Sequence, residues 1–309
     1  MRLDFHFFRA YSEKILGGKA TAPDLGYNQE DGSAPERFRN PGSRTRSETM
    51  LLACDIGNTT VAVGVFDGRK LVRDWHIRSD RDKTCDEYGI ILHNLLRMGG
   101  IDPAAVKSAI ISSVVPPLTP IFQTLCRSMF GGRPLVVGPG LRTGMPILYD
   151  APAEVGADRI SASVAAHEKY GGPCIVVDFG TATTFDAISA KGEYLGGAIA
   201  PGILISAEAL YLKTAKLPRI EIRKPAGIIG KTTVGSMQSG LYFGYVGLTQ
   251  TIIAELRKEL GEKAKVVATG GFGEQIASEV PAIDVCEPNL VLEGLRIIYE
   301  RQKDRAAER

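Results

Sequence analysis

Residues 50–67 read MLLACDIGNTTVAVGVFD, and residues 173–188 read PCIVVDFGTATTFDAI. Each stretch is an apolar run that ends in an aspartate, any residue and a glycine. Small hydroxyl or amide residues and then alternating apolar residues come next. Such a run predicts a buried strand, and the alternation after the glycine predicts the second strand of a hairpin. Because Asp55 and Asp178 hold equivalent places, the repetition predicts an internally duplicated α/β fold.

Strand and helix patterns alternate through the rest of the chain. Strands are predicted at residues 61–66, 71–77, 109–115, 135–137 and 264–271, and helices at 87–98, 118–130, 202–212, 234–260 and 290–301. A further helix over EVGADRISASVAAHEKY ends at the glycine pair 171–172, where the second copy begins. We therefore expect two α/β domains, residues 50–171 and 172–309, with a cleft between them.

The first 49 residues differ from the rest of the chain. They are polar, rich in glycine and proline, and show no periodicity, which is typical of a disordered leader. A start codon assigned too far upstream would give the same picture, with a compact protein beginning at Met50. We favour that second interpretation over a regulatory arm.

Composition excludes several classes of function. The net charge is +2, from 37 basic and 35 acidic residues without a basic block, so we expect no nucleic-acid partner. The five cysteines are scattered and form no C-x-x-C, which argues against a disulfide framework or a zinc site. No run approaches the roughly 18 apolar residues of a membrane span, and the N-terminus is a poor signal peptide. We expect a soluble, cytoplasmic protein.

The first hairpin loop has the chemistry of a phosphate site. An aspartate at the end of a buried strand is held rigidly, and Gly57 lets backbone N–H groups face an anion. Thr59 and Thr60 add hydroxyls, while Asp55 is suited to a hydrated magnesium ion, which needs only one or two carboxylates. A single copy reads equally well as an ordinary hairpin turn.

The second copy favours the functional interpretation. Asp178, Gly180 and Thr181 repeat the arrangement in order, and two such loops facing each other could hold the β- and γ-phosphates of a nucleotide. A third glycine-rich segment, VVATGGFG at 266–273, would let a base or ribose approach the backbone. Alone, that segment reads equally as a glycine turn that opens a helix.

Phosphoryl transfer to an alcohol also needs a base near the acceptor hydroxyl. EVGADR at 154–159 offers Asp158, with Arg159 beside it to bind an acidic substrate. The plain alternative is a helix-dipole carboxylate and a surface ion pair. GKTTVGSMQSG at 230–240 lacks the spacing of a P-loop. It therefore predicts substrate contacts or a threonine-capped helix start.

With these motifs assembled, the chain resembles the type III pantothenate kinases of the acetate and sugar kinase, Hsp70 and actin superfamily. The resemblance runs from Met50 nearly to the C-terminus and implies duplicated actin-like (ribonuclease H-like) domains. The matching pieces are DIGNTT, SSVVP, YDAPAEVGADR, DFGTATTFD, GGAIAPG, KLP, GKTTVGSMQSG and ATGG. One departure is Ala151, where the family often has asparagine after the Tyr-Asp pair.

The resemblance implies ATP-dependent phosphorylation of the primary hydroxyl of pantothenate, the first step of coenzyme A synthesis. It implies that Asp158 is the general base and that Asp178 holds the monovalent cation, potassium or ammonium, required alongside magnesium. The implied ATP contacts are Asp55, Ile56, Gly57, Asn58, Thr59, Thr60 and Thr181. The implied pantothenate contacts are Tyr149, Gly156, Ala157, Asp158, Arg159 and Thr233, in a pocket formed at a homodimer interface. The long helix after Thr233 would serve dimerisation.

Three other functions are compatible with the same motifs. A kinase of another small alcohol would keep the fold, although Arg159 favours an acidic acceptor. A non-catalytic regulatory relative, of the accessory transcription factor type, would not need the intact set of Asp55, Asp158 and Asp178. An actin- or Hsp70-like ATPase is a weaker alternative because the chain is too short for a chaperone's extra domains.

Overall fold

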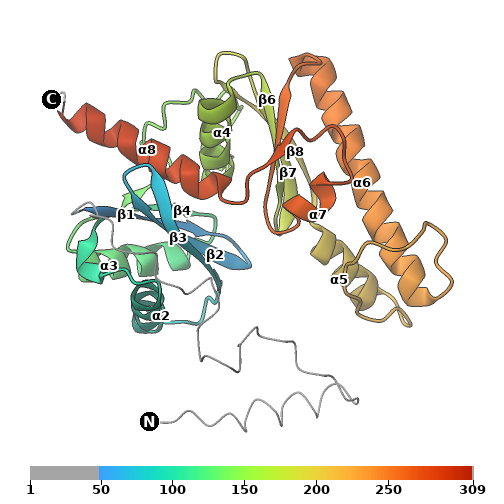
Figure 1. Ribbon diagram of the computed structural model, residues 1–309, viewed down its shortest axis with the longest axis horizontal. Helices are drawn as coiled ribbons and strands as arrows, with labels where there is room; N and C mark the ends of the chain where they lie inside the picture. The colour runs from blue at the N-terminus through green and yellow to red at the C-terminus, as the bar shows by residue number, and fades with distance from the viewer. Residues whose placement is uncertain (1–48, 308–309) are drawn as a thin grey trace, which may run out of the picture. The chain divides into compact units, whose positions relative to one another are not determined.

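The computed structural model describes residues 49–307. The predicted leader or misassigned start therefore lies outside the described residues, apart from Thr49. Figure 1 shows the described part as two sheets with helices against them. No helix in this part is long and apolar enough to cross a membrane.

The first sheet has five strands in the order β3-β2-β1-β4-β5. Its strands are β1 (Met50–Ile56), β2 (Thr60–Asp67), β3 (Lys70–Arg78), β4 (Val106–Ser113) and β5 (Leu135–Val136). β1 pairs antiparallel with β2 and parallel with β4. β1 is therefore the central strand, which explains why its sequence is an almost unbroken apolar run.

The second sheet repeats this arrangement. Its strands are β6 (Cys174–Phe179), β7 (Ala182–Ile188), β8 (Tyr194–Pro201), β9 (Lys265–Thr269) and β10 (Val285–Cys286), in the order β10-β9-β6-β7-β8. β6 pairs antiparallel with β7 and parallel with β9, as β1 does with β2 and β4. The equivalent strand order confirms the predicted duplicated α/β fold.

Helices cover both faces of each sheet. They are α2 (Cys85–Met98), α3 (Leu118–Phe130), α4 (Ala157–Tyr170), α5 (Ile203–Lys213), α6 (Thr233–Leu260), α7 (Gly273–Ala277) and α8 (Leu290–Ala307), with single 3₁₀ turns at Pro103–Ala105 and Pro152–Glu154. Local sequence sets their ends: Thr84 and Glu87 form a capping box before α2, and Gly131 ends α3 with φ 72°. Apart from the short α7, for which no periodic pattern was found, these helices lie where the periodicity predicts them.

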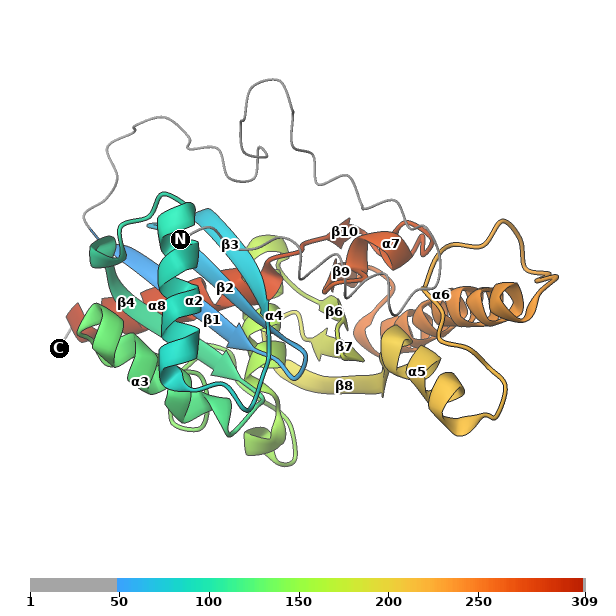
Figure 2. The same ribbon diagram turned by 90° about the horizontal axis from the view of Figure 1, so that it is seen from below.

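The alternation of side chains along the strands divides the core into layers. Leu52 and Cys54 of β1 pack with α2 and α3, which lie together on one face of the first sheet (Figure 2). Leu51 and Ala53 of the same strand pack with α4 and α8. On the second sheet, one face belongs to that same α4 and α8 cluster, and the other packs with α5, α6 and α7.

The pair α4 and α8 is the element that joins the two sheets. The two helices contact each other closely, and α8 also contacts β1, β2 and β4 although it comes last in the chain. α4 contacts β4 of the first sheet and both β6 and β7 of the second. The division into domains at residues 171 and 172 remains a prediction. The first residues of α4 are held between both sheets, and this placement positions the predicted base.

Candidate active site

Asp55 and Asp178 occupy the same position in the two sheets. Asp55 is the penultimate residue of β1 and lies opposite Ser112 on β4. Asp178 is the penultimate residue of β6 and lies opposite Thr269 on β9. Pairing on both sides fixes the backbone of each strand, so each aspartate is held beside the loop that comes after it. This is the placement that the repeated motif predicts.

The two hairpin loops after these strands touch. The Oγ1 atoms of Thr59 and Thr181 lie 2.8 Å apart, within hydrogen-bond distance. The first loop is closed by a 3.0 Å bond from Gly57 N to Thr60 O, and the second by a 3.1 Å bond from Gly180 N to Ala182 O. Two similarly closed turns thus bring their hydroxyls together from different sheets.

The neighbouring residues of the first loop hold it in place. Ile56 is buried, and its carbonyl oxygen accepts from Val114 N at 3.0 Å. Asn58 is exposed and its Oδ1 accepts from Arg81 Nη2 at 3.2 Å. Ile56 is thus buried with its carbonyl oxygen already bonded, whereas Asn58 and Thr59 have exposed side chains.

Asp158 lies in the first turn of α4 and folds back over the helix start. Its Oδ1 accepts from the backbone N–H of Arg159 at 2.8 Å, a favourable place for a negative charge. A Cβ added to Gly156, the residue that caps α4, would lie only 2.4 Å from that Oδ1. Glycine is therefore required at 156 for Asp158 to take this position. Ala157 is the buried first residue of the helix.

The carboxylates of the two sheets and α4 interact electrostatically. Burial and the charge of Asp158 raise the pKa of Asp55 to about 8, and the same two causes raise the pKa of Asp178 to about 7. Burial also raises the pKa of Asp158. Asp158 thus acts on both strand-end aspartates, so the structure brings together the three aspartates that the sequence singles out.

Arg159 does not form the surface ion pair that the non-functional interpretation of EVGADR predicts. Its side chain is 11% exposed and pairs with Asp186 on β7, whose side chain is 1% exposed, at 2.6 Å from Nη2 to Oδ1. The guanidinium lies 5.8 Å from the ring centroid of Tyr194. Tyr149 is placed against the same ring, with centroids 6.4 Å apart. Tyr149 and Arg159, both predicted as substrate contacts, are therefore linked through Tyr194.

Two further glycine motifs have a steric explanation at this site. A Cβ on Gly270, which has φ +89°, would lie 2.4 Å from Asp178 Oδ1. A Cβ on Gly202 would lie 2.1 Å from the carbonyl oxygen of Thr181. The glycines of ATGG and GGAIAPG thus allow β9 and the start of α5 to approach the second loop.

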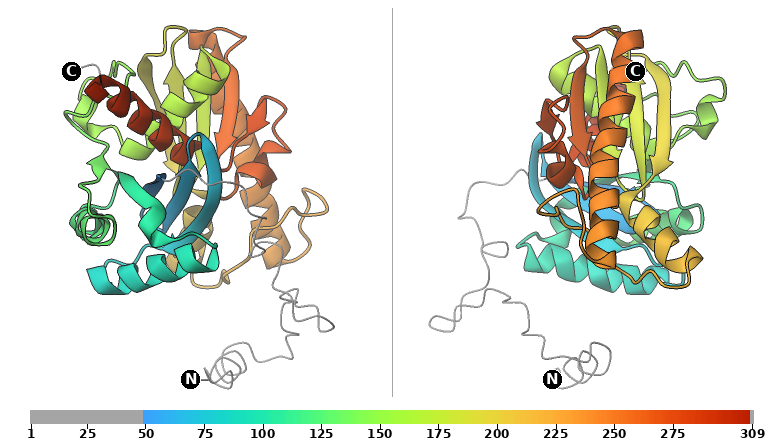
Figure 3. Two further views of the ribbon diagram at one scale, coloured as in Figure 1. Left: turned by 60° about the vertical axis from the view of Figure 1, so that its left-hand side comes forward. Right: turned by 90° about the vertical axis from the view of Figure 1, so that its right-hand side faces the viewer.

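Thr233 is not brought to the aspartates. It is the exposed first residue of α6, after the N-cap Thr232, and no bond between it and Asp158 or Arg159 occurs within residues 49–307. It lines a hollow of about 710 Å³ together with Leu217, Gly230, Lys231, Thr232, Ser236 and Met237. Figure 3 shows α6 running beside the second sheet with α5 next to it.

The family model described as type III pantothenate kinase matches residues 51–255. The chain belongs to the type III pantothenate kinase family. The type III pantothenate kinase of Geobacter sulfurreducens is 53% identical over 255 residues, which cover 82% of this chain and 100% of that protein. That of Moorella thermoacetica is 54% identical over 252 residues, covering 82% and 99%.

Solved structures show the same fold at much lower identity. A protein of Campylobacter jejuni described as a Baf family transcriptional activator superposes with a TM-score of 0.54 and 19% identity, over 82% of this chain and 100% of that one. At this identity the similarity shows the fold alone. The resemblance drawn from the sequence motifs is confirmed at the level of family and fold.

A kinase of this family implies a divalent metal, and the site fits a cation. Asp55 Oδ1 is buried and has no hydrogen-bond partner among residues 49–307, a state that costs free energy unless a ligand completes it. The described residues contain no cluster of three or more His, Cys, Asp or Glu arranged for a metal. A magnesium ion here would therefore rely on one or two carboxylates and on phosphate oxygens, as magnesium commonly does.

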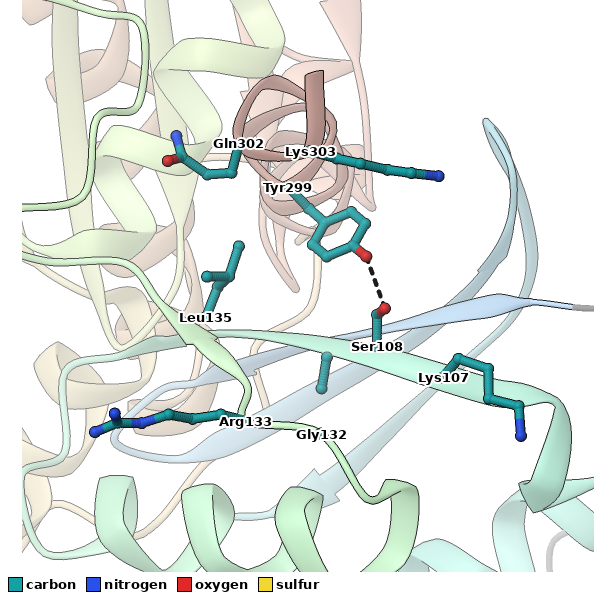
Figure 4. A pocket seen from close by; sticks show the side chains of 9 residues that line it. Lys107, Ser108, Gly132, Arg133, Leu135, Tyr299, Gln302 and Lys303 are labelled. Atoms are coloured by element: carbon teal, nitrogen blue, oxygen red, sulfur yellow. Dashed lines mark hydrogen bonds between the residues drawn. The ribbon is translucent and has the colours of Figure 1, made fainter. Parts of the chain in front are cut away.

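Another hollow lies away from the aspartates. It measures about 280 Å³ and is lined by Lys107, Ser108, Ala109, Gly132, Arg133, Leu135, Tyr299, Gln302 and Lys303. Tyr299 donates a 2.6 Å hydrogen bond to Ser108 on its wall, and the side chain of Arg133 extends to the side opposite those of Lys107 and Lys303 (Figure 4). It contains none of the predicted kinase residues.

Asp186 and Tyr194 are site residues that the sequence analysis missed. The signal for Asp186 is a charged residue inside an apolar strand, in TTFDAI. A charge in such a place is buried and needs a partner. The identity of the partner depends on how α4 packs against β7 and could not be read from the pattern.

Proposed function

We propose that this protein transfers the γ-phosphoryl group of ATP to the primary hydroxyl of pantothenate, giving 4'-phosphopantothenate in the first step of coenzyme A synthesis. The observation that carries the proposal is the convergence of Asp55, Asp158 and Asp178, from two sheets and a helix, in a member of the type III pantothenate kinase family.

The two hairpin loops are assigned to the phosphates. Gly57, Asn58, Thr59 and Thr60 would bind from the first sheet and Thr181 from the second, with Asp55 and Ile56 fixing the first loop. The 2.8 Å contact between Thr59 and Thr181 supports this assignment because both hydroxyls reach one point. Fixed donors around the transferring group lower the barrier mainly through positioning and charge stabilisation.

Asp158 is assigned as the general base. The acceptor oxygen forms a bond to the γ-phosphorus, the bond to the β–γ bridging oxygen breaks, and the hydroxyl proton passes to the Asp158 carboxylate. ADP leaves with the bridging oxygen. The raised pKa of Asp158 supports the role, since a carboxylate with a higher pKa is a stronger base than an ordinary aspartate.

Two cations are assigned to the carboxylates. Asp55 would hold magnesium and Asp178 the monovalent cation, potassium or ammonium. When bound, these ions supply positive charge that neutralises the phosphate oxygens. The unpaired Oδ1 of Asp55 supports the assignment because a cation would complete its interactions. Burial and the negative charges of Asp158 and Asp186 raise the pKa of Asp178, and a bound cation would offset that repulsion.

The pantothenate pocket is assigned to Tyr149, the segment 156–159 and Thr233. Arg159 supports an acidic acceptor over a neutral alcohol. Thr233 is exposed and lines a hollow that includes none of the other assigned substrate contacts, which supports a pocket completed by Thr233 of a second copy, in a homodimer. The regulatory alternative has no specific support, since the Baf-type relative shares only the fold.

The surface around β8, α5 and the start of α6 supports a homodimer. Large apolar side chains exposed there are Leu195, Ile199, Leu204, Ile205, Tyr211, Leu212, Ile228, Ile229 and Val234. On α6, a Cβ added to Gly240, Gly244 or Gly247 would meet nothing within 4 Å, so another helix has room to approach. Exposed apolar patches of this kind mark interaction sites.

We place the reaction in the cytoplasm. All five cysteines are free thiols, which suits a reducing compartment. No nucleic-acid or membrane partner is proposed.

The test is a coupled ADP-release assay on protein beginning at Met50, with and without pantothenate and with potassium, ammonium or neither. We expect release that depends on pantothenate and is strongly stimulated by either ion. Absence of pantothenate-dependent release would reject the function. Pantothenate-dependent release without any response to the ions would reject only the role of Asp178.

A further inference from the structure

Asp186 is the most constrained charged residue near the site. Its Oδ1 accepts from Arg159 Nε at 2.7 Å and from the Tyr194 hydroxyl at 2.8 Å, in addition to the contact with Nη2. Its Oδ2 accepts from Thr184 Oγ1 at 3.3 Å. The carboxylate is thus surrounded by donors from α4, β7 and β8, although none of the motif-based assignments includes it.

Burying a carboxylate to this extent costs free energy of folding unless the carboxylate is fully paired. A surface ion pair would leave Arg159 free to rotate and would contribute little to stability. Here two nitrogens of one guanidinium are held by a single buried oxygen, so the plane of the Arg159 side chain is fixed relative to β7. Tyr194 holds the same oxygen and also lies beneath the guanidinium.

This pairing leaves part of the guanidinium available. Arginine carries five N–H donors in a rigid fork, and Nε and Nη2 both face Asp186. No hydrogen bond of Nη1 occurs within residues 49–307. This available Nη1 edge belongs to Arg159, the residue next to Asp158. The Arg159 side chain is also linked to Tyr149 through the ring of Tyr194.

We propose that Asp186 is a positioning residue that orients Arg159 toward the carboxylate of the acceptor and so gives the site its preference for an acidic substrate. The inference rests on the proposed function, because it names what fixes one of the assigned substrate contacts. Asp186 itself touches no substrate. It acts only through the guanidinium that it holds.

The test compares pantothenate with its neutral primary amide as acceptors. In Asp186→Asn the asparagine keeps the shape but loses the charge that fixes Arg159. We expect kcat/KM for pantothenate to fall about 10- to 100-fold, the loss typical of a charged hydrogen bond, mainly through KM. Turnover of the amide and the KM for ATP should stay unchanged within error.

A mutant cycle separates positioning from general structural damage. Asp186→Asn added to Arg159→Gln should cause no further loss with pantothenate, because Asp186 acts through Arg159. Glu287→Gln is the matched control: Glu287 accepts from Lys169 Nζ at 2.7 Å at the opposite end of α4. This control should lower Tm without changing the ratio of acid to amide turnover.

Equal losses with both acceptors, or additive losses in the double variant, would overturn the proposal. If Asp186→Asn does not fold, Thr184→Val removes only the bond to Oδ2 and should show a smaller, equally acid-selective loss. An unchanged acid-to-amide ratio in that variant would then overturn the proposal. Wild-type protein without pantothenate-dependent turnover would instead reject the proposed function.

Discussion

The side-chain hydroxyls of Thr59 and Thr181 meet at 2.8 Å, although the two residues belong to different sheets. Each comes after an aspartate at the end of a central strand, so the contact joins the two copies of the repeated hairpin. Two exposed loops from unrelated parts of the chain would not be expected to meet by chance. Their closed turns support the proposal that the loops hold one ligand between them.

The first prediction concerns these hydroxyls. Thr59→Val and Thr181→Val keep the shape of the side chain and remove its hydrogen-bonding oxygen, so we expect the KM for ATP to rise about tenfold in each. Steady-state ADP release at varied ATP measures this. Thr124→Val, at an exposed threonine on α3, is the control and should match wild type. Unchanged KM values in both loop variants would contradict the assignment.

The second prediction concerns Gly156. Its φ of −56° and ψ of 138° are accessible to alanine, so Gly156→Ala should fold normally. The new Cβ would lie 2.4 Å from Asp158 Oδ1 and displace the base, and we expect kcat to fall about 100-fold. Gly138→Ala, where a Cβ meets nothing within 4 Å, should keep full activity. A normal kcat in Gly156→Ala would show that the position of Asp158 is not critical.

Much of this site could be predicted from sequence because it is built from local patterns. An apolar run ending in Asp-x-Gly specifies a buried strand with its carboxylate at the tip, and two copies specify the duplication. The partner of Arg159 could not be predicted in this way. Asp186 lies on a strand of the second sheet, and its contact with α4 depends on how that helix packs between the sheets. Likewise, nothing local to Thr233 shows that it lines a hollow without Asp158 or Arg159.

The third prediction tests the base directly. Asp158→Asn removes the proton acceptor but can still accept the hydrogen bond from Arg159 N, so we expect kcat to fall about 100- to 10,000-fold. Since burial already disfavours the charged form of Asp158, the neutral residue should not lower Tm. Turnover and thermal unfolding measured on the same sample check both statements. A kcat close to wild type would remove Asp158 from the chemistry.

The fourth prediction concerns the proposed homodimer. Ile199 on β8 and Ile90 on α2 are both 64% exposed, so they form a matched pair. Ile199→Arg places a charge in the proposed apolar interface and should give monomers with reduced pantothenate turnover. Ile90→Arg should remain dimeric and active. Sedimentation velocity measures the assembly. Monomeric wild type, or dimeric Ile199→Arg, would contradict the proposed interface.

The fifth prediction concerns stability and pH. The pKa values of Asp55, about 8, and Asp178, about 7, lie above the ordinary value of 3.8. Between the ordinary pKa of 3.8 and these raised values, the folded protein binds more protons than the unfolded chain. The free energy of unfolding should therefore be highest below about pH 4, as far as these two groups are concerned, and fall as the pH rises toward 8.

We expect Asp55→Asn to lessen this fall by about 1 kcal/mol or more between pH 6 and pH 8, as measured by urea unfolding in tetramethylammonium chloride. Asp304→Asn, at an exposed position on α8, should leave it unchanged. Replacing tetramethylammonium with potassium should stabilise wild type more at pH 8 than at pH 6, because a bound cation favours the ionised carboxylates. The same replacement should have little effect in Asp178→Asn. A potassium effect that survives in Asp178→Asn would place the cation elsewhere.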